Sequence, residues 1–265
     1  MYKVVISDLD GTLLNSQHHV SEFSRSTLKT LVDGGVRFMV ATGRHVIDVR
    51  GIRQTLGFDC DLITANGALV LAADDRLLFH RTLTPEIADD LLVVTRGRQT
   101  YDANVYMQNG WYVEREMPEW LEFHKESGFV YTLADFSKLD RSDIHKICFT
   151  GNHEALIDLE HELLERYPRE TSIVFSTPEC LEVMAENVNK GTAAREILAV
   201  DGLGIDDAIA FGDGMNDFEL LSMAAKGFLM ENATARLKEA LPDNPVAPNC
   251  DDDGVARCLV EIFDL

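Results

Sequence analysis

Basic residues are scarce in this chain. Its 265 residues include 24 lysines and arginines against 45 aspartates and glutamates, which gives a formal net charge of −21. A surface this acidic repels the phosphates of nucleic acid and of anionic membranes, so we expect neither as a partner. It also opposes anionic substrates in general, so a phosphate site here needs a local cation, a lysine and backbone N–H groups.

Long apolar runs and paired cysteines are also missing, and we expect no secretory leader. No apolar run reaches the roughly 18 residues of a membrane span, and "MYKVVISD" turns acidic too soon for a secretory signal. The five cysteines are odd in number and form no Cys-x-x-Cys pair, which favours reduced thiols over a disulfide framework or zinc site. We therefore expect a cytoplasmic protein. As to its assembly, the expectation is a monomer or weak homo-oligomer.

Short apolar strands alternate with helical stretches over the first 80 residues. "KVVIS" is nearly continuous in β-branched residues, which is typical of a strand buried on both faces. "SEFSRSTLKTLVDGG" has helical spacing, with Ser21 as its N-cap. Further strands are predicted at "VRFMVATG" and "DLITANGALV", with a helix at about 45–56 between them. This order predicts an α/β fold with a Rossmann-like, doubly wound parallel sheet.

The pattern changes between residues 84 and 184. "NVYMQNGWYVER" alternates around Asn109-Gly110, a strong hairpin signal, and more strands and an amphipathic helix follow. After residue 190 the first pattern resumes, beginning with the helix "KGTAAREILAVDGLG". We expect a discontinuous core at 1–83 and 185–265, with an inserted α+β domain at 84–184.

Two carboxylates stand at the end of the first strand, in "DLDGT". A charge is costly there unless something pairs with it, yet Asp8 and Asp10 lie two residues apart. Ligands of open α/β sheets bind beyond the carboxyl ends of the strands, so a functional site is favoured. The alternative is an ordinary Asp/Gly turn.

Three further segments carry polar groups at strand ends or helix starts. Thr42-Gly43 can hold a phosphate oxygen, although this dipeptide is also a common turn. In "GDGMND" the residues Asp213, Asn216 and Asp217 offer the hard oxygen ligands that suit Mg²⁺. Asp217 has two open roles, because it can serve this site or cap the following helix.

Lys190 opens a helix, where its charge opposes the helix dipole. A phosphate or carboxylate neighbour would explain it, and a solvated loop lysine is the alternative. A carboxylate cluster with a lysine is what Mg²⁺-assisted phosphoryl transfer requires.

In their order and spacing, "DLDGT", "TGR", "NKGT" and "GDGMND" resemble the four motifs of the haloacid dehalogenase (HAD) superfamily of phosphatases. The insertion resembles the class IIB cap of its Cof-type branch, a cap domain that contacts substrate. "YKVVISDLDGTLL", "ATGRH", "TANGA" and "CLEVMA" are also similar to bacterial Cof-type enzymes that dephosphorylate pyridoxal phosphate and sugar phosphates. The resemblance implies a Mg²⁺-dependent phosphomonoesterase that works through an aspartyl-phosphate.

The resemblance also implies roles for the motif residues. Asp8 would be the nucleophile, and Asp10 the general acid and then the base. Mg²⁺ would bind the carboxylates of Asp8 and Asp213 and the backbone carbonyl of Asp10, while Asp217 supports the metal or orients Lys190. The substrate phosphate would be held by Leu9 through its backbone, Thr42, Gly43, Lys190 and Asn216.

Substrate specificity would come from residues near the phosphate loop and in the cap, although each candidate also has a purely structural reading. The candidates are Arg44, His45, Asn104, Trp111, Arg115, His145 and Glu182. A phosphomutase or phosphotransferase could use the same four motifs. A non-enzymatic phospho-aspartate regulatory module is a further alternative, against which Asp10, the intact fourth motif and the cap all argue.

Overall fold

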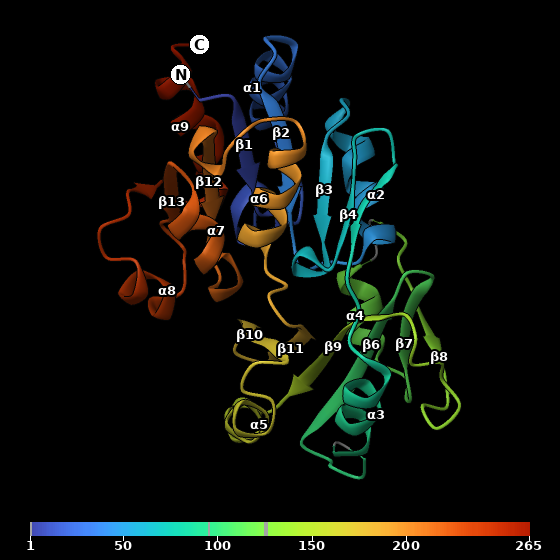
Figure 1. Cartoon of the computed structure of the whole chain (residues 1–265). Helices are drawn as coiled ribbons and strands as arrows, with labels where there is room; N and C mark the ends of the chain where they lie inside the picture. Colours follow the sequence, from blue (N-terminus) through green and yellow to red (C-terminus); the bar gives the residue numbers. More distant parts are fainter. Residues whose placement is uncertain (1, 95, 125–126) are drawn as a thin grey trace.

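The computed structural model describes residues 2–94, 96–124 and 127–265, and it contains two separate sheets (Figure 1). The larger sheet has the strand order β14-β13-β12-β1-β2-β3-β4-β5. Its strands are β1 (Val4–Ser7), β2 (Arg37–Ala41), β3 (Asp61–Thr64), β4 (Leu69–Leu71), β5 (Leu77–His80), β12 (Ala208–Gly212), β13 (Lys226–Met230) and β14 (Val246–Ala247). We call the part built on this sheet the core.

The core is the doubly wound α/β fold that the sequence predicts. β1 lies between β2 and β12 and is parallel to both. Helices cover both faces: α1 (Glu22–Asp33), α2 (Val46–Leu56) and α9 (Gly254–Phe263) on one side, α6 (Lys190–Val200), α7 (Phe218–Met223) and α8 (Ala235–Ala240) on the other. Val5 packs toward the first group and Val4 and Ile6 toward the second, so both faces of β1 are buried.

One strand prediction was wrong. "DLITANGALV" is not a single strand but two antiparallel strands, β3 and β4, joined by a turn at Ala65–Gly67. Asn66 and Gly67 have φ angles of 56° and 101°, which no strand contains. A Cβ on Gly67 would lie 2.7 Å from the backbone oxygen of Asn189, so the close approach to the start of α6 also requires glycine here.

The second sheet lies below the first in Figure 1 and has the order β10-β11-β9-β6-β7-β8. Its strands are β6 (Tyr101–Met107), β7 (Gly110–Val113), β8 (Tyr131–Leu133), β9 (Ile144–Gly151), β10 (Thr171–Thr177) and β11 (Cys180–Ala185). The helices around it are α3 (Pro85–Val94), α4 (Pro118–Phe123) and α5 (His153–Arg166). The hairpin prediction is confirmed, because β6 and β7 pair from Asn104↔Val113 to Met107↔Gly110. We call this part the cap.

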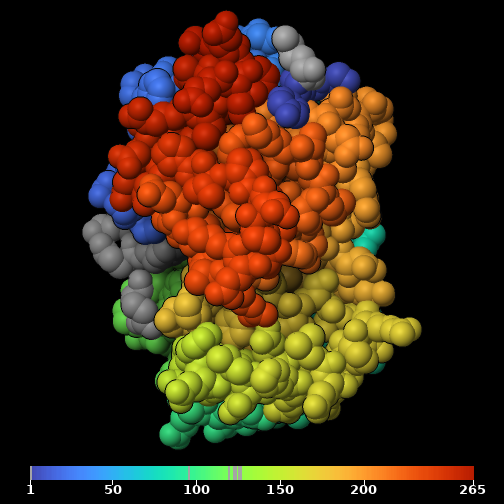
Figure 2. Space-filling model, turned by 90° about the vertical axis from the view of Figure 1, so that its left-hand side faces the viewer, coloured from blue at the N-terminus to red at the C-terminus, as the bar shows by residue number. Residues whose placement is uncertain are grey.

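Core and cap lie directly against each other, as Figure 2 shows on one face of the molecule. Arg236 of α8 lies 3.8 Å from Glu160 of α5 across this boundary. His45 spans another part of it, since its Nε2 lies 2.6 Å from the backbone oxygen of Met107. Among the described residues no helix has the length and apolar character to cross a membrane.

Candidate active site

Asp8 sits at the carboxyl end of the central strand of the core. Its backbone N–H donates to Phe211 O at 3.0 Å, which extends the pairing of β1 with β12 by one residue. The side chain is 8% exposed. The parallel sheet therefore delivers a buried carboxylate to the edge where ligands of such folds bind.

Lys190 lies beside Asp8 although 182 residues separate them. Its Nζ donates to Asp8 Oδ1 and to Asp217 Oδ1, each at 2.7 Å, and the side chain is fully buried. Asn189 places it by capping α6, since Asn189 Oδ1 accepts from Thr192 N at 2.7 Å. The anionic neighbours that its helix-start position implies are therefore these two carboxylates.

Asp217 makes no capping hydrogen bond to α7. Its Oδ2 instead accepts from the backbone N–H groups of Asp213 and Gly214, each at 3.0 Å. One carboxylate thus holds both Lys190 and the loop that carries Asp213. Asp213 Oδ1 in turn accepts from Thr12 Oγ1 at 3.1 Å, which links this loop to the "DLDGT" segment.

The charges around Asp8 do not balance without a cation. Carboxylate oxygens of Asp8, Asp213 and Asp217 lie within 4.8 Å of one another, and Lys190 supplies one positive charge among them. Burial and the neighbouring carboxylates raise the pKa of Asp8, and they raise the pKa of Asp213 to about 7. A divalent cation with oxygen ligands fits this donor set, and Mg²⁺ is the common ion of that kind.

Mg²⁺ affinity should depend on pH because these carboxyl groups must ionise to bind it. Since the fold raises their pKa values, the cation displaces protons below about pH 7. The dissociation constant should fall up to about tenfold per pH unit for each displaced proton, and level off above pH 7. Calorimetric titration with Mg²⁺ at a series of pH values measures this, and a constant affinity between about pH 5.5 and 7.5 would contradict it.

Gly11 has no side chain, and the carboxylate of Asp213 occupies the space that a side chain there would need. Its φ is +68°, and a Cβ there would lie 2.4 Å from Asp213 Oδ2. We expect Gly11→Ala to weaken Mg²⁺ binding at least about tenfold, because the loop must move or Asp213 must turn away. Gly35→Ala is the matched control: φ is +89° and nothing lies within 4 Å of its Cβ, so Mg²⁺ binding should be unchanged. Equal loss in both variants would assign the effect to backbone strain alone.

The Asp10 side chain is bound to Arg44. Arg44 Nε donates to Oδ2 at 2.7 Å and Nη2 to Oδ1 at 2.6 Å, and His18 Nδ1 lies 3.5 Å from Oδ1. Burial would raise the pKa of Asp10, but hydrogen bonds from Arg44 and His18 outweigh it and hold the pKa well below the usual value. This arrangement favours the anion, whereas a general acid must carry a proton. Asp10 would have to leave Arg44 to do so.

The phosphate-loop residues meet above the same sheet edge. Thr42 is 1% exposed and its hydroxyl oxygen accepts from Arg44 N at 3.1 Å. Asn216 Nδ2 donates to Asn66 Oδ1 at 3.1 Å, which joins the fourth motif to the β3–β4 turn. Leu9 is buried in the apolar core, so only its backbone remains for phosphate.

A cavity of about 440 Å³ joins this edge of the core to the cap. Asp8, Asp10, Thr42, Gly43, Arg44, Asp213 and Asn216 line its core side. The cap side carries three aromatic rings, a buried Lys–Glu pair and two thiols, namely Tyr106, Trp111, Trp120, Lys146, Glu182, Cys148 and Cys180. The volume suits a small metabolite.

The specificity candidates divide into two groups. Arg44, Asn104, Trp111 and Glu182 line the cavity, and Asn104 Oδ1 accepts from Trp111 Nε1 at 3.0 Å. The other three lie outside the lining. Arg115 pairs with Asp102, His145 lies against His80, and His45 accepts from Ile47 N at 3.1 Å as the cap of α2.

Lys146 is the main cavity residue that the sequence analysis missed. Its Nζ donates to Glu182 Oε1 at 2.6 Å and to Gly43 O at 2.7 Å, so a cap lysine contacts the core loop that is predicted to hold phosphate. The signal was present, because "HKICFTG" places a lysine directly before three apolar residues of a predicted strand. A buried lysine needs an anionic partner, and here that partner is Glu182.

Comparison with known proteins identifies the family of this chain. The sequence model of the haloacid dehalogenase-like hydrolase family matches residues 5–259. A Haemophilus influenzae protein named as a phosphatase is 39% identical over 100% of this chain and 98% of its own length. The HMP-PP phosphatase of Yersinia pseudotuberculosis is 35% identical over 98% of this chain and 94% of its own.

Solved structures agree on the fold. A haloacid dehalogenase-like hydrolase from B. subtilis has a TM-score of 0.87 at 26% identity and covers 97% of this chain and 98% of its own. A HAD subclass IIB sugar phosphatase has a TM-score of 0.86 at 21% identity over 99% of both chains, a likeness of fold alone. The chain belongs to the haloacid dehalogenase-like hydrolase family. Within it the chain is a phosphatase, the activity for which both relatives are named.

Proposed function

We propose that the protein is a Mg²⁺-dependent phosphomonoesterase that hydrolyses small phosphorylated metabolites through an aspartyl-phosphate on Asp8. The observation that carries this is the buried Asp8 carboxylate, 2.7 Å from Lys190 Nζ and beside Asp213, at the floor of a cavity. Such a carboxylate can attack phosphorus as long as it stays deprotonated.

The side chains around Asp8 have separate tasks in this proposal. Asp8, Asp213 and the Asp10 carbonyl would hold Mg²⁺, which when bound supplies positive charge for the phosphoryl oxygens. Lys190 fixes the nucleophile and adds a second positive charge. The Thr42 hydroxyl and the Asn216 amide would donate to the remaining phosphate oxygens.

Asp10 is the residue that would move the proton. In the conformation described, Arg44 holds it as an anion, which suits the base that activates water in the second half of the reaction. For the first half it would release Arg44 and carry a proton to the leaving oxygen. Arg44 would keep its hydrogen bond to Asp48 at 3.0 Å and could turn its other nitrogens toward the substrate, because it lines the same cavity.

The cap side of the cavity favours a flat, ring-bearing substrate. Tyr106 and Trp120 bring half-buried rings to this wall, and the buried Trp111 supports Tyr106 by stacking behind it. Asn104 and the Lys146–Glu182 pair supply polar groups at the same wall. Pyridoxal phosphate fits this pattern better than a sugar phosphate, and both remain candidates. HMP-PP, for which the Yersinia relative is named, is a third.

A phosphate-release screen tests the proposal. Pyridoxal phosphate, HMP-PP, hexose and pentose phosphates and nucleotides are incubated with the enzyme, with and without Mg²⁺. We expect multiple turnovers that need Mg²⁺ and no added acceptor. The highest kcat/KM is expected for compounds with a flat aromatic ring. Release only in the presence of a sugar acceptor would instead establish a phosphotransferase or phosphomutase. A single turnover with a lasting phosphoenzyme would favour a regulatory module.

A further inference from the structure

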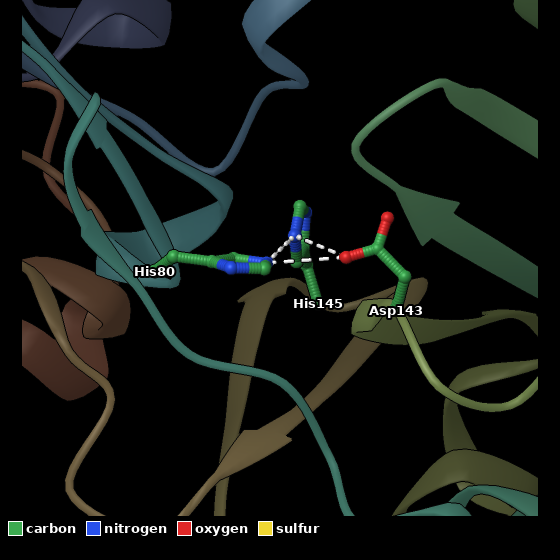
Figure 3. Close-up of side chains that lie close together, drawn as sticks. All are labelled: His80, Asp143 and His145. Carbon is green, nitrogen blue, oxygen red and sulfur yellow. Dashed lines mark hydrogen bonds and ion pairs between the residues drawn. The ribbon is translucent and has the colours of Figure 1, made fainter. Parts of the chain in front are cut away.

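A second cluster of ligating side chains lies away from the active site. His80 ends β5 of the core, and Asp143 and His145 lie at the start of β9 of the cap (Figure 3). His80 Nε2 lies 2.6 Å from His145 Nε2 and 3.2 Å from Asp143 Oδ1, and His145 Nε2 lies 3.5 Å from the same oxygen. Three ligand atoms thus point at one place, as the sticks in Figure 3 show.

A single proton has to serve all three ligand atoms of this cluster. The two Nε2 atoms are so close that only one of them can carry a proton, and that proton points toward the other nitrogen. Asp143 Oδ1 then faces both rings without a proton of its own. A cation at the meeting point would accept a lone pair from each of the three atoms.

The surroundings prepare these groups as ligands. Gln108 N donates to Asp143 Oδ2 at 3.2 Å, which orients the carboxylate with Oδ1 toward the rings. His145 is 1% exposed, whereas His80 and Asp143 are 33% and 30% exposed, so the cluster is open to solvent on one side.

We propose that His80, Asp143 and His145 form a binding site for a transition-metal dication, with Zn²⁺ as the best fit. Two imidazoles and one carboxylate make a common zinc ligand set, and the open side leaves a fourth position for water. Zinc lies about 2.0–2.1 Å from imidazole nitrogen, so the two Nε2 atoms must separate to roughly 3.3 Å. The partly exposed His80 side chain can make that shift.

The position of the site gives it a mechanical consequence. His80 belongs to the core sheet and the other two ligands to the cap, and the connecting chain is held nearby by Leu83 N donating to Ile144 O at 2.8 Å. A bound metal would tie the two parts together beside this connection. The site is independent of the proposed phosphatase function.

Two other groups compete for metal in the described part of the chain. Asp8, Asp213 and Asp217 are oxygen ligands that suit Mg²⁺, and excess Mg²⁺ can occupy that site during the test. Cys148, Cys180 and Glu182 form the other group, but Glu182 is already paired with Lys146 at 2.6 Å. The experiment separates all three.

The test is a titration of the full-length protein with Zn²⁺ in excess Mg²⁺, followed by competition with a chromogenic chelator. We expect one equivalent bound per chain, and binding at least about tenfold weaker in His80→Gln and in Asp143→Asn. His161→Gln, at an exposed histidine on α5, and Cys148→Ser should bind as the unmodified protein does. Co²⁺ in place of Zn²⁺ should give visible ligand-field bands that His80→Gln removes.

Unchanged binding in both His80→Gln and Asp143→Asn would overturn the proposal, as would loss of binding in Cys148→Ser alone. His145→Gln is also expected to weaken binding. Because His145 is buried, the circular dichroism and the metal-free thermal unfolding of this variant are recorded beside the binding data. The partly exposed His80 and Asp143 keep the test decisive if His145→Gln fails to fold.

Discussion

Asp8→Asn is expected to lower kcat by at least about 10⁴-fold. The amide matches the carboxylate in shape, and its oxygen can still accept from Lys190, so the fold should survive. The amide cannot attack phosphorus, because it lacks the negatively charged oxygens of a carboxylate. The measurement is steady-state phosphate release on the best substrate of the screen, together with thermal unfolding to show an intact structure.

Two comparison variants sharpen this result. Asp33→Asn removes an exposed carboxylate on α1 that pairs with Lys29 at 2.9 Å, and it should retain full activity. Asp10→Asn should slow turnover and allow the aspartyl-phosphate to accumulate, which acid quenching with labelled substrate would detect. Full activity in Asp8→Asn would remove the basis for the mechanism, whatever the comparison variants do.

Lys190→Met is expected to lower both stability and activity. Removing the ammonium leaves Asp8 and Asp217 as buried carboxylates without their shared partner, and breaking a buried ion pair in this way costs about 3–5 kcal/mol. Phosphate release should become undetectable, since the nucleophile loses its fixed position. Urea unfolding gives the change in free energy, and the phosphate assay gives the change in rate.

The double variant Lys190→Met/Asp217→Asn separates the two effects. An asparagine at 217 removes one of the stranded charges, and its side-chain oxygen can still accept from Asp213 N and Gly214 N. Stability should therefore recover in part, while activity should not. A single variant as stable as the unmodified protein, or a double variant that regains turnover, would contradict the role given to this lysine.

The core side of the site follows from the sequence because a parallel sheet brings its strand ends together. Asp8 follows β1, Thr42 follows β2 and Asp213 follows β12, and these three strands are neighbours. Strand patterns therefore predict which side chains meet. Asn66-Gly67 carries the same Asn-Gly signal that predicts the hairpin at Asn109-Gly110. The prediction of one strand was wrong because apolar residues continue on both sides of this dipeptide, which favours a single buried strand.

The cap side of the site could not be predicted in the same way. Lys146 meets Gly43 across 103 residues, and that contact depends on how the inserted domain packs on the core. No local pattern encodes such packing. His45 shows the converse: it stands in the motif region "TGRH", yet its ring stacks on Phe129 of the cap with centroids 4.9 Å apart. Proximity in sequence to a phosphate loop does not place a side chain in the cavity.

The contact from Lys146 to the carbonyl of Gly43 has a thermodynamic consequence. It joins the cap to the loop that would hold the phosphate, and Asn66 makes a second such link by donating to Glu182 while accepting from Asn216. If these links exist only when the cap is docked, cap docking and phosphate affinity share one coupling free energy. By linkage, a substrate that gains affinity from docking must shift the docking equilibrium by the same factor. Variants of Lys146 would then alter both quantities together, even though its contact with the core is to a backbone oxygen.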